Sequence, residues 1–570
     1  MRTSDQDALL SDTPARVPVG YWALLILLTL VVGWGLIYKL GQDISWDTRN
    51  YHLYNAYAVI HDRLDYDLAP ASRQSYFNPA LDIFHYVIGT AASPLAATLA
   101  TATLQMLAVF AVFAIAFQLT VRRLPGGLSA WGVLGGLALL AAAGFASPMN
   151  VRQFGILSGD TVTAVPLLAG MVVLMTGLGH PSSAALGWRR VLLAGGLVGV
   201  SVGLKLTNAS AALACLIAVL VCLPGLMPRL RFSLLFAVAG TLGVALSAGW
   251  WWGIVYAKFG NPIFPAYNHV FRSPELPAIS YADVRYHVAP LWERLLMPFQ
   301  YNRFTGIRYV NNLFDDFRLP LVILGCVAGL GTDVVRSFFK KNGSGSPSDQ
   351  TSPADPRQLL ARFLLVVAAV TYIAWAAVFA VPRYLLILEL LAPVIMLAAG
   401  ILIFRFRPAT WIVTALGFLL IMGTISGLRR KDLRVPFHPE LTAGVQPPQG
   451  IDFSNALMIM EGNGPYAYVI PTFPESARWV RIKGNLYPDD AWLDYGFGDR
   501  VRQIITNHQG PLYVIYIADY NNYQMPSLEH FSLVADTDQA FLIKTPKAAH
   551  DLTIHPLRRS DQARNVRADD

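Results

Sequence analysis

Long apolar runs with almost no charge recur along this 570-residue chain and constrain its fold more than any other feature. Runs of about 17–25 residues match the thickness of a lipid bilayer. They lie roughly at residues 21–40, 95–121, 131–148, 156–178, 190–204, 209–228, 233–257, 319–334, 363–381, 385–404 and 409–427. Because backbone groups find no water inside a bilayer, each run must form a helix. The sequence therefore predicts a polytopic α-helical membrane protein.

The composition of the chain supports the same class. Hydrophobic residues make up 54% of the sequence and charged residues only 14%, and the mean hydropathy of +0.44 is too high for a soluble globular protein. The net charge of +8 would favour nucleic-acid binding in a soluble protein, but here the basic residues stand between apolar runs. We therefore expect no nucleic-acid partner. Three cysteines lie inside apolar runs, without disulfide or metal-binding spacing: Cys215, Cys222 and Cys326.

The basic connections predict which side of the membrane each segment occupies. They are Arg122-Arg123, Arg189-Arg190, Arg229 with Arg231, residues 336–362, and Arg405 with Arg407. Positively charged connections face the cytoplasm. Residues 1–20 are then a cytoplasmic N-terminus, and the run at 21–40 is an uncleaved span. We expect the protein to be a multi-pass protein of a bacterial inner membrane.

The transmembrane domain is expected at residues 21–428, with three long connections. These are a first outer loop at 41–79, a long outer loop at 258–318 and a cytoplasmic linker at 335–361. Residues 80–94 are apolar but short, so we interpret them as an interfacial or re-entrant helix. A twelfth span is the alternative, which gives about 11–12 transmembrane helices in all.

Residues 429–570 are richer in proline and charge, and no run there is long enough to span. We expect a soluble α/β domain on the outer, periplasmic face. Short β-like runs stand at 456–460, 466–470, 511–518 and 541–544. We expect the segment 474–483 to form turns or a helix.

A polar loop, residues 45–82, follows the first span directly and is rich in Asp, Tyr, His, Asn and Arg. A helix over residues 47–64 would gather Leu53, Tyr57, Ile60 and Leu64 in one apolar stripe. The opposite face would carry Asp47, Tyr51, Tyr54, Ala58 and Asp62. A reactive loop fits this pattern, but so does a solvated helix lying at the membrane surface.

Asp47 is the strongest candidate in this loop for a chemical role. It comes seven residues after the first span, and a carboxylate near the headgroups is costly unless it has a partner or a function. If the substrate is a sugar on a lipid phosphate, the attacking hydroxyl needs a general base, and a carboxylate can serve. Tyr51, His52 and Tyr54 could pack against the sugar.

Three cations at outer span ends could hold the phosphate of such a substrate: Arg152, Lys205 and Arg383. Each could instead simply extend its charge to the membrane surface. Asp160 and Glu389 lie inside spans and are either polar groups between helices or part of the same cavity; Glu389 could pair with Arg383.

Further residues could line the sugar or acceptor site, or a metal site. Asn78, Asp62, Asp160 and Tyr267 complete the predicted sugar and acceptor set. His52, His61, Asp62 and His85 could in principle bind a divalent metal, but their spacing matches no strong template. We therefore expect no metal or other cofactor, with a divalent metal as the weaker alternative.

Four short motifs stand out along the chain: Asp47 early in the first outer loop, Phe-Asn-Pro-Ala-Leu at 77–81, Gly-Leu-Lys-Leu-Thr at 203–207, and Arg383-Tyr384 at the start of a late span. Together they resemble the GT-C superfamily of membrane glycosyltransferases. This superfamily includes protein mannosyltransferases and aminoarabinose transferases that act on lipid A. The chain departs from it at Thr48, where many members have a second acidic residue, and at 77–81, where a Pro-Pro-Leu turn is common.

The resemblance implies a fold, an activity and partners. It implies a GT-C-like bundle, a polyprenyl-phosphate-linked sugar donor and an outer-face acceptor that is a glycan, lipid or cell-wall polymer. Asp47 would be the catalytic residue. The alternatives from other classes are a transporter or flippase of lipid-linked sugars, which would need ionisable residues along mid-span paths, and a non-catalytic membrane scaffold.

Overall fold

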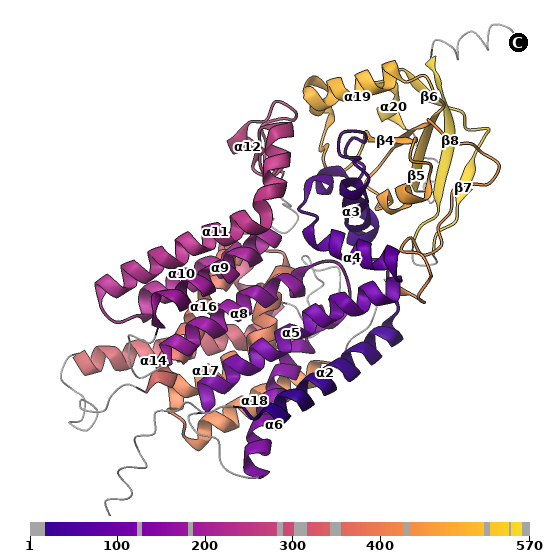
Figure 1. Cartoon of the computed structure of the whole chain (residues 1–570). Helices are drawn as coiled ribbons and strands as arrows, with labels where there is room; N and C mark the ends of the chain where they lie inside the picture. Colours follow the sequence, from indigo (N-terminus) through magenta and orange to yellow (C-terminus); the bar gives the residue numbers. More distant parts are fainter. Residues whose placement is uncertain are drawn as a thin grey trace, which may run out of the picture.

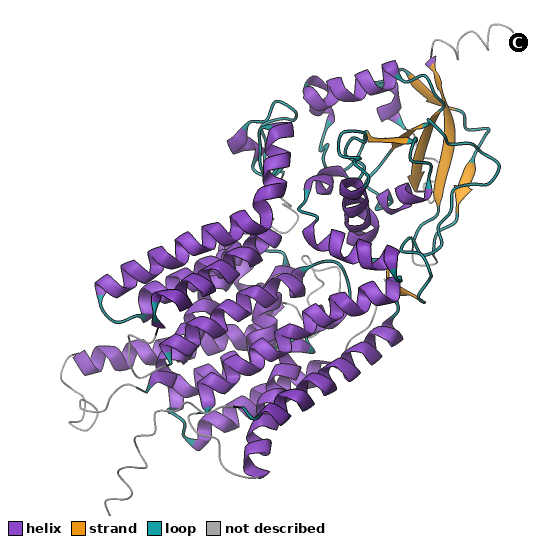
Figure 2. Cartoon of the chain, in the orientation of Figure 1, coloured by secondary structure: helices purple, strands orange, loops and turns teal. Residues whose placement is uncertain are grey.

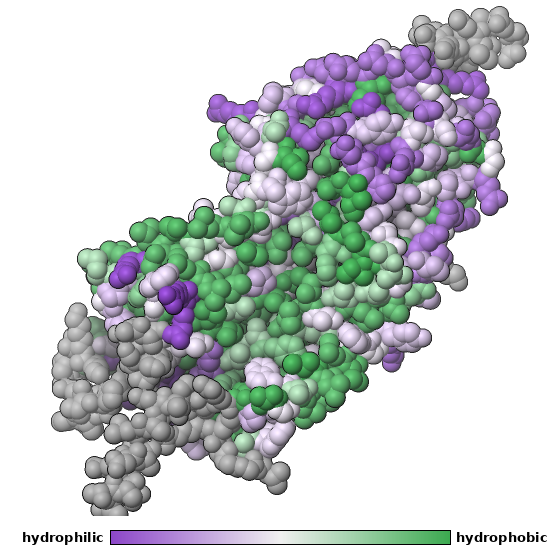
Figure 3. Space-filling view, viewed as in Figure 1, coloured by the Kyte–Doolittle hydropathy of each residue, from purple (hydrophilic) through white to green (hydrophobic). Residues whose placement is uncertain are grey.

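The computed structural model describes residues 17–121, 128–179, 186–281, 289–300, 316–341, 355–425, 434–517, 525–546 and 549–560. Over these residues a bundle of long helices carries a smaller, sheet-containing domain at one end (Figures 1 and 2). Hydrophobic residues cover the visible face of the bundle, and hydrophilic residues cover much of the smaller domain (Figure 3). The surface thus matches a membrane-embedded part and a water-exposed part.

Each of the eleven apolar runs contains one long helix, as predicted. These helices are α2 (Val19–Leu40), α5 (Pro94–Thr120), α6 (Leu128–Phe145), α8 (Asp160–Leu178), α9 (Trp188–Leu204), α10 (Ala209–Cys222), α11 (Leu226–Phe259), α14 (Arg318–Lys341), α16 (Pro356–Val378), α17 (Leu386–Phe404) and α18 (Pro408–Ile425). Within the described residues, seven helical segments are long and apolar enough to cross a membrane: α2, α5, α8, α11, α14, α16 and α17 with the turn before it. The chain is a multi-pass membrane protein.

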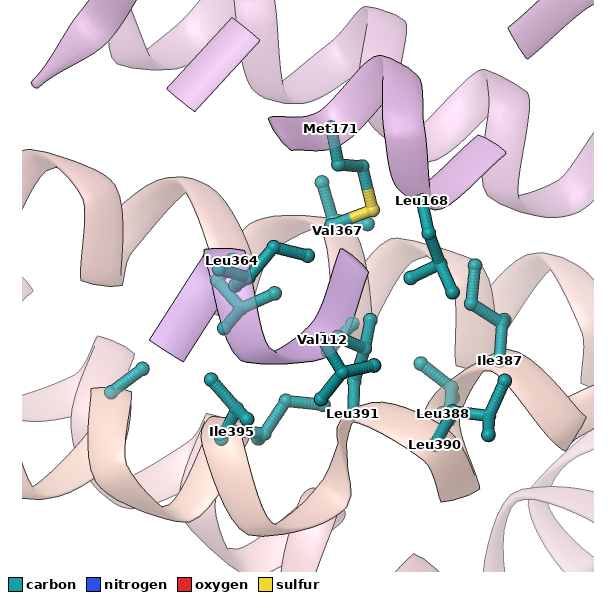
Figure 4. Close-up of a cluster of buried hydrophobic side chains, with 14 of the residues drawn as sticks. Val112, Leu168, Met171, Leu364, Val367, Ile387, Leu388, Leu390, Leu391 and Ile395 are labelled. Carbon is teal, nitrogen blue, oxygen red and sulfur yellow. The ribbon is translucent and has the colours of Figure 1, made fainter. Parts of the chain in front are cut away.

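Helix α17 forms the centre of the bundle. Every residue from Leu386 to Leu402 is buried, because the helix is apolar on all sides and α14, α16, α18, α6 and α5 pack around it. In Figure 4 its side chains Leu391 and Ile395 lie among Val112 of α5 and Leu364 of α16. The turn that leads into this helix, residues 382–385, is therefore held in a fixed place.

Glycines let α9 and α11 approach one another closely. Gly195, Gly199 and Gly203 repeat every fourth residue on α9, and a Cβ added at any of them would lie within 3.0 Å of α11 backbone or side-chain atoms. At Gly199 the nearest atom is the carbonyl oxygen of Gly240. Small residues at this spacing allow tight helix packing in membranes. The packing also fixes the end of α9, where Lys205 follows.

The first outer loop and the short apolar segment after it fold into four short helices. They are the π-helix η1 (Thr48–His52), α3 (Leu53–Ile60), the 3₁₀ helix η2 (Ser72–Tyr76) and α4 (Ala80–Ala91). Helix α4 has 12 residues, about 18 Å at 1.5 Å per residue, which is too short to cross the hydrocarbon core of about 30 Å. This length favours the re-entrant or interfacial interpretation of the segment.

The prediction of a two-faced helix at residues 47–64 was wrong in part. A helix does form, but it ends at Ile60 and begins as a π-helix. Tyr51 and Tyr54, which were expected to face away from the apolar stripe, pack in the same hydrophobic cluster as Leu53 and Tyr57. The reason is that residues of the C-terminal domain, including Met458 and Trp479, cover the side that would otherwise face water.

The C-terminal domain is built on a six-stranded mixed sheet. Strands β4 (Arg478–Arg481), β3 (Leu457–Met460) and β5 (Leu512–Ile517) are parallel neighbours, and β8 (Leu552–Arg559) runs antiparallel to β5, β6 (Leu533–Ala535) and β7 (Phe541–Ile543). Two helices accompany the sheet, α19 (Gly496–Asn507) and α20 (Pro526–Glu529), with the 3₁₀ helices η7 (Ala467–Thr472) and η8 (Asp490–Asp494). The predicted α/β domain is present.

The strand predictions are confirmed at β3, β5 and β7. The run at 466–470 is instead part of η7, which contains Pro471, a residue without an N–H for a sheet ladder. The segment 474–483 contains strand β4, not the expected turn or helix. Its four residues are stabilised by pairing with β3, a contact that no local pattern specifies.

The first outer loop is joined to the C-terminal domain through backbone pairing. Strand β1 (Gln42–Asp43) pairs with β2 (Arg434–Val435), which follows the last span. Farther along the loop, Leu68 extends the sheet at its β4 edge: its N–H donates to the Trp479 carbonyl at 2.9 Å, and its carbonyl accepts from the Arg481 N–H at 3.1 Å. The loop is thus part of the domain that covers it.

Side chains reinforce this connection. The buried Arg63–Asp67 ion pair, at 2.7 Å, also binds the backbone of the domain, since Asp67 accepts from the Trp479 N–H at 2.9 Å. Phe264 of the long outer loop stacks on Phe497 of α19 with 5.7 Å between ring centroids. The first outer loop, the long outer loop, α11 and the C-terminal domain therefore pack together in one hydrophobic cluster.

The remaining boundaries differ slightly from expectation. Helices α14 and α16 occupy both ends of the expected linker 335–361, and residues 342–354 lie outside the described residues, as do 1–16 and 426–433.

Three short helices remain to be named among the described residues: α7 (Pro148–Gln153), α12 (Asn268–Phe271) and α13 (Leu291–Gln300). Which side of the membrane the C-terminal domain occupies stays a prediction.

The contact between α9 and α11 makes a direct stability prediction. Replacing Gly199 with Val should force the two helices apart and lower the free energy of unfolding by about 1–3 kcal/mol. Gly196→Val is the matched control, because a Cβ there meets no atom within 4 Å. Thermal unfolding of the two purified variants in detergent tests this. Equal melting temperatures would contradict the close packing.

Candidate functional site

The π-helix η1 determines which side chains of the first outer loop lie together. The Leu53 N–H donates to the Thr48 carbonyl, five residues back. An α-helix turns about 100° per residue and would place residues five apart on different sides, whereas the wider π-turn brings Asp47 and His52 close enough to interact. Single π-turns often occur at functional sites. The loop before it is closed by Asp43, which accepts hydrogen bonds from Thr48 Oγ1 and from the Ser45 N–H.

Asp47 forms an ion pair with Arg383 across the top of the bundle. The Arg383 Nη1 donates to Asp47 Oδ2 at 2.5 Å, and the side chains are 15% exposed for Asp47 and 33% for Arg383. Arg383 belongs to η6 (Pro382–Leu385), the turn that leads into the central helix α17. Burial alone would raise the pKa of Asp47, but the nearby charges of Arg383, His52 and Lys205 outweigh it, so the pKa is lowered. Asp47 is therefore an ionised carboxylate.

A second ion pair stands beside the first. Lys205, just after α9, binds Asp160 Oδ1 at 2.5 Å and also donates to the Ser158 carbonyl. Asp160 is the first residue of α8 and follows Gly159, whose φ of 75° allows the sharp turn there. Its other oxygen, Oδ2, is buried and has no hydrogen-bond partner in the part of the chain that the structure describes. Lys205 thus lies with its charge at the same end of the bundle as Arg383.

His52 pairs with a carboxylate that the sequence did not single out. His52 Nδ1 lies 2.6 Å from Asp82 Oδ1, and both side chains are buried. Asp82 is in the first turn of α4, and burial raises its pKa. The Tyr51 ring packs on the His52 imidazole with 4.0 Å between centroids. The arrangement fixes the imidazole next to Asp47.

Arg152 is the third predicted cation, in α7. Its backbone carbonyl accepts from Arg434, but within the described residues its side chain makes no ion pair. Its pKa is lowered first by burial and then by the charge of Arg383, so the two guanidinium groups feel one another. Tyr384 completes this group, with its ring 5.9 Å from Lys205 Nζ and 5.4 Å from the Arg383 guanidinium.

A narrow apolar groove lies beside these charges. Residues of α4, of α5, of the turn before α8 and of α8 itself line it: Leu81, Phe84, Thr101, Leu104, Ile156, Leu157, Gly159 and Val162. Leu81 precedes Asp82, and Gly159 precedes Asp160. The immediate chain neighbours of both carboxylates therefore line the groove.

Two residues of the predicted sugar and acceptor set have structural partners instead. The Tyr54 hydroxyl donates to Asp67 at 3.1 Å, inside the network that joins the loop to the C-terminal domain. The Asn78 amide donates to the carbonyls of Gly203 and Ser247, both at 3.1 Å, and its oxygen accepts from the Ala80 N–H. Asn78 thus holds the loop against α9 and α11.

Two other members of that set lie apart from the ion pairs. Asp62 is exposed at the end of α3 with a φ of 51°. Tyr267 is 44% exposed before α12, and its ring lies near His269, at 5.9 Å. Neither contacts Asp47, Lys205 or Arg383 among the interactions of the described residues.

Glu389 has partners other than Arg383, the possible partner named from the sequence. Glu389 is buried in α17, where it interacts with Ser147 and with the charges of Asp316 and Arg318. Arg383 points to the first outer loop because Asp47 binds it there. Glu389 therefore belongs to a separate polar group at the start of α14.

The four possible metal ligands do not form a cluster. His52 binds Asp82, His85 binds Thr101 at 2.9 Å, and His61 lies near Glu475 at 3.0 Å. Asp62 is exposed beside His61. No group of three or more His, Cys, Asp or Glu side chains within the described residues has the geometry of a metal site.

Comparison with known proteins gives a distant likeness in structure only. No family model matches the chain, and no curated protein sequence matches it. The chain is similar to the crystal structure of ArnT from Cupriavidus metallidurans bound to undecaprenyl phosphate, with 14% sequence identity and a TM-score of 0.45 over 94% of this chain and 98% of that one. The apo state of the same ArnT gives 14% identity and a TM-score of 0.44 over the same shares. At this distance no residue role is transferred between the two proteins.

The buried His52–Asp82 pair makes a testable contribution to stability. In Asp82→Asn the imidazole loses its charged partner, and the free energy of unfolding should fall by about 1–3 kcal/mol. Thermal unfolding of the purified protein measures this. Asp65→Asn is the control, because Asp65 is 83% exposed. If the two variants are equally stable, the pair does not stabilise the loop.

Proposed function

We propose that this protein is a membrane glycosyltransferase that moves a sugar from a polyprenyl-phosphate carrier to an acceptor on the outer face of the membrane. The acceptor is a glycan, a lipid or a cell-wall polymer. One observation carries the proposal: the carboxylate of Asp47 lies among the cations Arg383, Lys205 and Arg152 at the end of the bundle, beside an apolar groove. A lipid phosphate needs this combination of positive charge and apolar surface.

Each part of the site has a role in this proposal. Arg383 offers a planar guanidinium that suits phosphate oxygens, and Lys205 and Arg152 add positive charge as the phosphate leaves. The apolar side chains that line the narrow groove contact the first isoprene units of the carrier. Tyr51 and Tyr384 offer ring surfaces to the sugar. The proposal gives Asp62, Asn78 and Tyr267 no role in binding the donor or the acceptor.

The transfer step follows from these roles. The acceptor hydroxyl attacks the anomeric carbon and gives its proton to Asp47. A new bond forms between the acceptor oxygen and the anomeric carbon, while the bond from that carbon to the phosphate oxygen breaks. The electron pair leaves with the phosphate, which the cations stabilise. In this proposal Asp47 is the catalytic residue, the role that the resemblance implies for it.

The position of the acidic residues argues against a transporter. A transporter needs ionisable groups near the middle of its spans, whereas Asp160 and Glu389 are in the first turns of α8 and α17. We place the protein in a bacterial inner membrane, with the C-terminal domain in the periplasm beside the site. There the domain holds the first outer loop and is next to the incoming acceptor.

The test is sugar transfer by the wild-type protein and by Asp47→Asn. Lipids from source cells fed ¹⁴C-glucose supply labelled polyprenyl-phosphate sugars, and the envelope of unlabelled cells supplies acceptors. Vesicles with wild-type protein should move label into a covalent product. Asp47→Asn should lower the rate by on the order of 10²–10⁴, the usual contribution of a general base.

Asp65→Asn is the control for the loss of one negative charge in the same loop. It should transfer sugar at the wild-type rate. Transfer by Asp47→Asn at that rate would exclude Asp47 as the catalytic residue. Label that enters the vesicles without forming a covalent product would indicate a transporter, and no movement of label by any protein would indicate a scaffold.

A further inference from the structure

The free protein already neutralises two of the three cations that the proposed function assigns to the donor phosphate. Arg383 binds Asp47, and Lys205 binds Asp160. These two ion pairs are not equivalent. Lys205 is 18% exposed, its partner Asp160 only 4%, and Lys205 is held in addition by the Ser158 carbonyl. The Lys205–Asp160 pair is therefore a fixed part of the bundle.

The Arg383–Asp47 pair is more open and less completely bonded. Its side chains are 33% and 15% exposed, and within the described residues only Nη1 of the guanidinium donates a hydrogen bond. An arginine has five N–H donors, so the remaining donors are available to a second anion. Arg152 lies nearby and makes no ion pair with any residue that the structure describes, and its charge repels Arg383.

We propose that Arg383 exchanges partners during the reaction: it binds Asp47 in the free protein, and it turns to the donor phosphate when the donor enters. The exchange rests on the proposed function. Binding of the donor then releases Asp47 from its ion pair with Arg383.

The exchange follows from the competing demands on Asp47. A general base must bind the acceptor proton, but a carboxylate held by a guanidinium has a lowered proton affinity, and the pKa of Asp47 is lowered in this way. When phosphate takes over Arg383, the carboxylate loses its strongest cationic partner and becomes more basic. His52 stays close to Asp47 and is itself held by Asp82, so the carboxylate keeps its place.

The proposal implies an order of events. Donor binding precedes activation of the acceptor hydroxyl, which gives its proton to Asp47 as its oxygen bonds to the anomeric carbon. The bond to phosphate breaks, and the phosphate leaves with the electron pair while bound to Arg383. When the carrier phosphate departs and Asp47 has released its proton to water, Arg383 returns to Asp47. Without donor, Asp47 is kept inactive.

Binding of undecaprenyl phosphate to the purified full-length protein in detergent tests the exchange without an acceptor. In the wild type, the phosphate must compete with Asp47 for Arg383. Asp47→Asn should therefore bind the probe about fivefold more tightly, a coupling of roughly 1 kcal/mol. In the Arg383→Gln background, the same Asp47→Asn change should have no effect, because no guanidinium has to be released.

Other results of this double-mutant cycle contradict the exchange. An equal gain in both backgrounds means that Asp47 only repels the phosphate, and no gain in either means that the pair does not compete with it. Asp65→Asn, the charge control, should bind like the wild type. If undecaprenyl phosphate binds to none of the proteins, the proposed donor class fails, and the exchange fails with it.

Infrared difference spectroscopy on the wild type provides a second test if Arg383→Gln does not fold. Undecaprenyl phosphate has no carboxylate, so any change in the carboxylate stretching bands comes from the protein. Adding the probe should shift one such band as Asp47 leaves Arg383, and the shift should be missing in Asp47→Asn. Probe binding without a shift would overturn the exchange.

Discussion

Three ion pairs hold the first outer loop in place, and the structure around the loop depends on them. Asp47 binds Arg383 at the start of the central helix, His52 binds Asp82 on α4, and Arg63 binds Asp67 against the C-terminal domain. An unpaired buried charge costs several kcal/mol. Arg383 belongs to the bundle and Asp82 to α4, while the Arg63–Asp67 pair within the loop accepts the Trp479 N–H of the C-terminal domain. The pairs therefore hold the loop at the junction of the bundle and the domain.

The bundle supplies the fixed ends that these pairs require. Burial on all sides holds α17, which positions Arg383, and close packing of α9 on α11 positions Lys205. The C-terminal domain supplies the cover, since Leu68 of the loop is paired within its sheet. A loop that would be mobile on its own therefore becomes a rigid part of the site, which is what positioned catalytic groups need.

The features of this protein that depend on local composition could be predicted from the sequence. The spans follow from run length and hydrophobicity, and Asp47, Arg152, Lys205 and Arg383 were found because each stands next to a span end. The structure brings these four residues into one region. Their chemical roles remain a proposal.

Contacts between distant segments could not be predicted. Asp82 lies 30 residues after His52, and no spacing rule connects them. The π-helix η1 packs against η7 of the C-terminal domain, and that domain also covers α3; no local pattern specifies either contact. Asn78 and Tyr54 were expected near the sugar because they are polar and close to Asp47 in sequence, but tertiary hydrogen bonds use their polar groups elsewhere.

An experimental structure of the full chain with undecaprenyl phosphate bound would show directly whether this end of the bundle holds the donor. We predict phosphate density within hydrogen-bond distance of Arg383, near Lys205 and Arg152, with the first isoprene units against the groove lined by Leu81 and Val162. Lipid phosphate bound elsewhere on the bundle, with this region unchanged, would contradict it.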